Sequence, residues 1–150
     1  SRRRHTRSAY VTGVLTCALP ICQALTARAE EILRPAWNRV RTDAASAPVF
    51  AGISGTMHCL KALELGVRDR NALEGQFLSR AFVEAMRDRL SGMPLPQRKA
   101  LPGMNPDRAD VLDCGAAILC AFFNISGISG IEVRILGDNM LGYARMRFPA

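Results

Sequence analysis

The fold of this chain is decided by the stretch PDRADVLDCGAAILCAFF, residues 106–123. From Ala109 to Phe123 this stretch is apolar nearly all round, which predicts a central helix buried on every side. Asp107 is expected to cap the helix, and Asp110 to lie in its first turn, where a carboxylate suits the helix dipole. The other elements are therefore expected to surround this segment.

Three more elements are predicted from the spacing of apolar residues. Gln23–Arg41 has helical spacing, with Pro35 expected to kink or split the helix. A second helix is predicted between Ser79, its N-cap, and Gly92, which ends it. Ile131–Leu136 alternates apolar and charged residues, which predicts a strand with one face in water.

The stretch PVFAGISGTMHCLKALELG, residues 48–66, predicts a strand, a tight turn and a helix. Its apolar run Val49–Ile53 indicates a buried strand. Thr56–Leu65 has a helical pattern that Gly66 ends. The small residues at the turn form our candidate anion site: Gly52, Ser54, Gly55 and Thr56.

A turn of this kind suits an anion for two physical reasons. The first N–H groups of a helix have no partner within the helix, and the helix dipole favours negative charge there. Glycine also lets a phosphate approach the backbone closely. Many α/β units have such a turn without any ligand, so a purely structural turn stays open as the alternative.

Charge and cysteine content limit the function classes. The net charge is +7, of which residues 1–22 carry +4 and no acid, so the remainder has an ordinary mixed surface and no nucleic-acid partner is expected. No apolar run reaches the ~18 residues of a membrane span.

The five cysteines are odd in number and form no C-x-x-C pair, which indicates free thiols in a reducing, cytoplasmic compartment. His5 and His58 lack partners at metal-ligand spacing, so no metal site is expected.

The opening SRRRHTRSAYVTGVLTCALPI, residues 1–21, has three interpretations. As a signal peptide it has a basic start but a diluted apolar middle. As a nucleic-acid arm it has only four arginines. It also resembles a peptide that recurs at the ends of proteins inferred from metagenomic DNA and that is similar to translated sequencing-adapter DNA. We interpret residues 1–22 as a non-native leader.

Three segments, taken in order, resemble the Ppx/GppA family of exopolyphosphatases and guanosine pentaphosphate phosphohydrolases. Residues 51–66 resemble the glycine-glycine-threonine turn and helix of the family's second domain, with Ser54 in place of the first glycine. Residues 74–119 resemble the segment in which Arg-Ala-Asp, here residues 108–110, opens the central helix. Residues 131–146 resemble the last strand and closing turn.

The resemblance implies an α/β fold, in which residues 23–150 are part of a C-terminal phosphatase domain. That domain is the second one of the actin-like or sugar-kinase (RNase H-like) fold. It would be incomplete here, mostly helical and with about two strands. Gly52, Ser54, Gly55 and Thr56 would then line the phosphate cleft.

The function implied is hydrolysis of the terminal phosphoanhydride bond of polyphosphate or guanosine pentaphosphate, with Mg²⁺ in the intact enzyme and a homodimer as its assembly. The catalytic residues would lie upstream, so this chain is expected to contain no catalytic or metal-binding residue and to be inactive alone. Two alternatives stay open: a non-catalytic structural or regulatory module of the same fold, and the nucleotide-binding half of a related ATPase or kinase.

Overall fold

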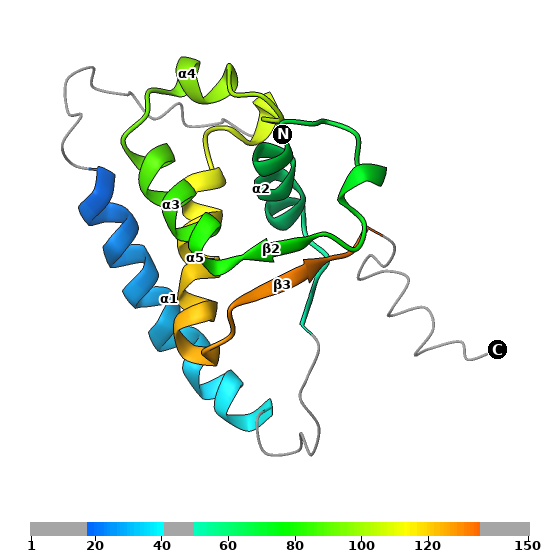
Figure 1. Cartoon of the computed structure of the whole chain (residues 1–150). Coiled ribbons are helices and arrows are strands. Elements are labelled where there is room, and N and C mark those ends of the chain that lie inside the picture. Colours follow the sequence, from blue (N-terminus) through cyan, green and yellow to red (C-terminus); the bar gives the residue numbers. More distant parts are fainter. Residues whose placement is uncertain (1–17, 41–49, 136–150) are drawn as a thin grey trace, which may run out of the picture.

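Helix α5 (Leu112–Ser126) lies at the centre of the structure and packs against both α1 (Ala18–Val40) and α3 (Arg80–Ser91) (Figure 1). The structure is a computed structural model, and it describes residues 18–40 and 50–135. Eight of the fifteen α5 residues are buried, and Phe123 is completely inaccessible. The helix is central and largely buried, as predicted, but it is not buried on every side, because Cys114, Ile118 and Asn124 are exposed.

The start of the central helix differs from the prediction. Residues 106–108 form a short 3-10 helix, η3 (Pro106–Arg108), and α5 begins only at Leu112. Asn105 caps η3, since its side-chain oxygen accepts the Asp107 N–H at 3.0 Å. Asp107 therefore does not cap α5, and Asp113, rather than Asp110, lies in the first turn of α5. The physical reason is that the 3-10 turn consumes the residues that were expected to start the helix.

Helix α1 is a single helix that contains Pro35 and is not split by it. It begins at Ala18, ahead of the predicted start at Gln23. The Thr26 hydroxyl is buried and donates to the carbonyl oxygens of Cys22, at 2.9 Å, and Ala117, at 3.2 Å. The hydrogen bond to Ala117 joins α1 to α5. The division of the chain into residues 1–22 and 23–150 stays a prediction.

A small sheet has the strand order β1 (Ala51–Gly52), β3 (Gly130–Val133), β2 (Phe77–Ser79). β1 runs parallel to β3, with Gly52 opposite Val133, and β2 runs antiparallel to it. The two expected strands are present but shorter than predicted, and Val49 lies outside the described residues. No strand was predicted at β2, because its three residues are too few for an alternating pattern.

The order of strand, turn and helix predicted for this stretch is confirmed over the described residues 50–65, but the strand is not buried as expected, because Ala51 is exposed and Ile53 is 46% exposed. α2 (Gly55–Leu65) follows β1, and Gly66 ends it in the left-handed conformation at φ 67°. Its middle, Cys59–Ala62, packs into the core, where Leu60 is inaccessible to solvent. A loop and a short 3-10 helix, η2 (Asn71–Leu73), then lead from α2 to β2.

The second predicted helix is also confirmed. Ser79 caps α3, its hydroxyl accepting the Phe82 N–H at 3.2 Å, and Gly92 follows the last residue. The short α4 (Leu95–Lys99) is joined to α5 by an ion pair 3.0 Å long between Arg98 and Asp113, each side chain 12% exposed.

No helix in residues 18–40 and 50–135 is long and apolar enough to cross a membrane. The described cysteines are all free thiols, as expected: Cys22, Cys59, Cys114 and Cys120.

Candidate functional site

The candidate site lies where β1 turns into α2. Ser54 is the N-cap residue of α2, in extended conformation (φ −117°, ψ 158°), and its carbonyl oxygen accepts the His58 N–H at 3.1 Å. Its hydroxyl makes no capping bond and instead donates to the Met57 sulfur at 2.6 Å. The backbone N–H groups of the first turn are therefore left without a side-chain acceptor, which suits an anion.

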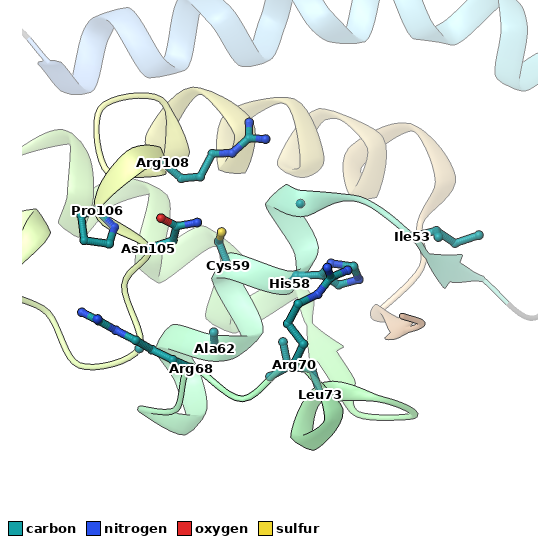
Figure 2. A pocket seen from close by; sticks show the side chains of 12 residues that line it. Ile53, His58, Cys59, Ala62, Arg68, Arg70, Leu73, Asn105, Pro106 and Arg108 are labelled. Atoms are coloured by element: carbon teal, nitrogen blue, oxygen red, sulfur yellow. The ribbon is translucent and has the colours of Figure 1, made fainter. Parts of the chain in front are cut away.

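A cavity of about 490 Å³ runs along one side of α2 from this turn (Figure 2). Three segments line it: α2, the loop and η2 that follow it, and the segment around η3. Its polar lining residues are His58, Arg68, Arg70, Asn105 and Arg108. Its volume lies within the ~300–1,000 Å³ range of small-molecule sites.

The cavity is electropositive. Arg68, Arg70 and Arg108 are exposed, and none of them forms an ion pair or a side-chain hydrogen bond with another described residue. No Asp or Glu of residues 18–40 and 50–135 lines the cavity. Guanidinium groups without a carboxylate partner, beside a helix N-terminus, create a positive potential that attracts anions.

His58 is oriented by the backbone of the strand end opposite. Its Nε2 lies 2.9 Å from the carbonyl oxygen of Arg134. Because a carbonyl oxygen only accepts, Nε2 carries the hydrogen and donates it, which leaves Nδ1 as the other polar atom of the ring.

The four residues singled out in the sequence do not all meet at this cavity. Gly55 lines it, and a Cβ at Gly55 would lie 3.7 Å from Nη2 of Arg108. Ser54 and Thr56 instead line a second, mostly apolar cavity of about 370 Å³ between α2 and α5.

Gly52 is buried and lines neither cavity. A Cβ there would lie 2.8 Å from Ile131 Cδ1 and 2.9 Å from Met57 Cγ. Close packing in the core therefore explains this glycine.

The arginines of the cavity were missed as site residues. Arg108 was noted only as part of the Arg-Ala-Asp trio, and its position beside Gly55 depends on how η3 packs near α2. Arg68 and Arg70 carry no periodic or motif signal. A search for basic residues in the loop that follows α2 would have found Arg68 and Arg70.

Cys59 lies in the cavity wall but is not poised as a nucleophile. Burial raises the pKa of its thiol, and the neighbouring positive charge of Arg108 acts in the opposite direction without cancelling that effect. The thiolate is the reactive form, so a raised pKa keeps Cys59 neutral and inert.

The residues that line the cavity are not suitable ligands for a Mg²⁺ ion. Mg²⁺ prefers carboxylate oxygens, and the lining provides arginines, a histidine and a single side-chain amide, that of Asn105. Among the described residues no group of three or more His, Cys, Asp or Glu is placed to hold a metal. The wall is chemically suited to holding an anion.

Comparison with solved structures shows the same fold in larger proteins. An exopolyphosphatase-like protein matches with a TM-score of 0.70 at 23% identity, over 87% of this chain and 44% of that one. The Aquifex aeolicus member of the Ppx/GppA family matches with a TM-score of 0.64 at 21% identity, over 83% and 41%. An exopolyphosphatase from Cytophaga hutchinsonii matches with a TM-score of 0.60 at 20% identity, over 77% and 38%.

These likenesses confirm the expected α/β fold class. The chain spans less than half the length of each of these proteins. A comparison with curated protein sequences finds no relative. The model of the Ppx/GppA phosphatase family matches residues 16–135, which is most of the chain. The chain therefore belongs to the Ppx/GppA phosphatase family.

Proposed function

We propose that this chain forms a phosphate-binding wall of a hydrolase that cleaves the terminal phosphoanhydride bond of polyphosphate or guanosine pentaphosphate. The observation that carries the proposal is Arg108, which has no ion-pair partner among the described residues and lies beside Gly55 at the start of α2. Membership of a phosphatase family supports this hydrolase function over the alternative that the chain is the nucleotide-binding half of a kinase.

The chemistry of this wall is binding and charge stabilisation. A guanidinium presents paired N–H donors that match two phosphate oxygens, and the free N–H groups of α2 add further donors. Donors held in place stabilise the negative charge that develops on a phosphoryl group during transfer. The described residues that line the cavity include no carboxylate to activate water, so we expect the chain alone to bind phosphates without hydrolysing them.

The remaining parts of the proposal concern the intact enzyme. There Mg²⁺ would be held by residues other than those of this wall. We propose a cytoplasmic, bacterial enzyme that forms a homodimer, with polyphosphate or guanosine pentaphosphate rather than nucleic acid as its ligand.

The test measures binding of inorganic phosphate and pyrophosphate to the full chain by calorimetry at low ionic strength. Arg108→Gln should weaken pyrophosphate binding by at least about tenfold, since one charge-assisted hydrogen bond contributes roughly 1.5–3 kcal/mol. Arg89→Gln is the matched control, because Arg89 is exposed on α3 and does not line the cavity. Equal losses in the two variants would contradict the proposal.

A second test uses an intact member of the family. A bulky residue at the position of Gly55 should weaken substrate binding, because it would fill the space between the start of α2 and Arg108. Phosphate release is measured at several substrate concentrations. An unchanged KM would count against a phosphate site at this turn.

A further inference from the structure

Arg68 and Arg70 lie in the loop after α2, at the opposite end of that helix from the glycine turn, yet they line the same cavity as Gly55 and Arg108. In Figure 2, Arg68 extends towards the side where Asn105 and Pro106 lie, whereas Arg70 extends towards His58. The positive groups are thus spread around the cavity rather than gathered at one point. A single phosphate bound at the start of α2 would not contact the guanidinium groups of Arg68 and Arg70.

The backbone that carries these two arginines is well anchored. The Val67 N–H donates to the Ala62 carbonyl oxygen at 3.1 Å, and the Leu73 N–H donates to the Arg70 carbonyl oxygen at 3.0 Å. Between the arginines, the Asp69 carboxylate accepts the Asn71 N–H at 2.9 Å and does not line the cavity. The nearest carboxylate in the sequence is therefore engaged by its own loop and leaves both guanidinium groups without an ion pair.

The size of the cavity also exceeds what one phosphate needs. Its volume of about 490 Å³ lies within the ~300–1,000 Å³ range of sites for drug-sized ligands. A phosphate ion has only five non-hydrogen atoms. The volume and the distribution of positive charge both fit an anion with several phosphoryl groups in a row.

We infer that Arg68 and Arg70 are specificity-determining residues that bind the part of a linear oligophosphate beyond the phosphate held at Gly55 and Arg108. The inference rests on the proposed function and deepens it. Affinity should rise with the number of phosphoryl groups, and these two arginines should be the source of that rise. Both side chains are exposed and form no hydrogen bond or ion pair with another described residue, so we expect their removal to leave the chain folded.

The experiment compares inorganic phosphate, pyrophosphate and tripolyphosphate by calorimetry on the full chain. The variants are Arg68→Gln/Arg70→Gln, its charge-retaining counterpart Arg68→Lys/Arg70→Lys, Arg108→Gln and the off-cavity control Arg89→Gln. Circular dichroism confirms that each is folded. The first variant should lose about tenfold in tripolyphosphate affinity and little in phosphate affinity. The lysine variant should recover part of the loss, and Arg89→Gln should behave as the wild type.

Two outcomes separate the inference from the proposed function. If Arg68→Gln/Arg70→Gln keeps the wild-type ratio of tripolyphosphate to phosphate affinity while Arg108→Gln weakens both, the inference is overturned and the proposed function stands. If the wild type binds none of the three anions, or Arg108→Gln binds all of them unchanged, the proposed function fails and the inference fails with it.

Discussion

Thr56, in the first turn of α2, lies directly against Gly115 of α5: a Cβ on Gly115 would be 2.8 Å from Thr56 Cγ2 and 3.0 Å from Thr56 Oγ1. Real Cβ atoms essentially never approach other atoms so closely. The missing side chain of Gly115 therefore allows the start of α2 to pack on the central helix. This contact positions the turn that carries Gly55 at the cavity.

Gly115→Ala should destabilise the chain by about 1–3 kcal/mol, because overpacking forces α2 away from α5. Gly92→Ala is the matched control, since Gly92 has ordinary φ and a Cβ there would meet only the Asp88 carbonyl oxygen at 3.9 Å. The free energy of unfolding is measured by urea denaturation. A loss no larger in Gly115→Ala than in Gly92→Ala would show that α2 shifts freely on α5.

Two glycines with positive φ should respond differently to the same substitution. Gly103 has φ +78°, and a Cβ there would overlap the backbone carbonyl of Ala62 in α2. Gly127 has φ +71° with open space around it. Gly127→Ala should cost about 1–2 kcal/mol, the price of the left-handed conformation alone. Gly103→Ala should cost clearly more or prevent folding, and similar thermal melting points for the two variants would contradict this.

The ion pair between Arg98 and Asp113 should matter far more than the surface pairs. Both side chains are 12% exposed, and Arg98 also donates from Nε to the Met93 carbonyl oxygen at 2.8 Å. Arg98→Met should cost about 3 kcal/mol, since it leaves the Asp113 carboxylate buried without its partner. In comparison, Arg28→Ala removes an exposed pair with Glu31 and should cost under ~1 kcal/mol.

A double-mutant cycle tests the Arg98 prediction further. Arg98→Met/Asp113→Leu removes both charges, so it should recover part of the stability lost in Arg98→Met. Urea denaturation of the two single variants and the double variant gives the coupling energy. Additive losses would mean that the two side chains do not depend on each other.

The buried thiols should make the chain less stable in alkali. Burial raises the pKa of Cys59 and of Cys120 above the ordinary thiol value of 9.0. Above pH 9.0 the unfolded chain has released these protons while the folded chain still holds them. The free energy of unfolding therefore falls as the pH rises from 9.0 towards the folded-state pKa values.

The contribution of one thiol to this pH dependence is measured by comparing how steeply the free energy of unfolding falls with pH in the wild type and in a cysteine variant. Cys120→Ala removes one such group, so its unfolding free energy should fall less steeply above pH 9.0 than that of the wild type. Cys114→Ala is a weaker comparison, since Cys114 is exposed although its pKa is also raised by partial desolvation. Identical slopes for the wild type and Cys120→Ala would contradict the prediction.

The sequence alone was informative wherever a signal is local. Ser79 followed by a helical pattern predicted α3 with its cap, and Gly66 predicted the end of α2. The apolar run around Phe123 predicted the central helix. Local signals failed at residues 106–111, where a cap at Asn105 competes with the expected cap at Asp107 and a 3-10 turn forms first.

The sequence by itself determined the central helix, α3 and the turn before α2, because helical periodicity, caps and glycine stops act within a few residues. The α/β fold class followed from the resemblance of three segments to the Ppx/GppA family. Only the tertiary structure decided which residues share a cavity. Arg68, Arg70 and Arg108 lie around the cavity that Gly55 lines, whereas Ser54 and Thr56 line the second cavity. The distance between side chains from separate segments depends on how α2 packs against η3 and α5, and no local signal in the sequence fixes that packing.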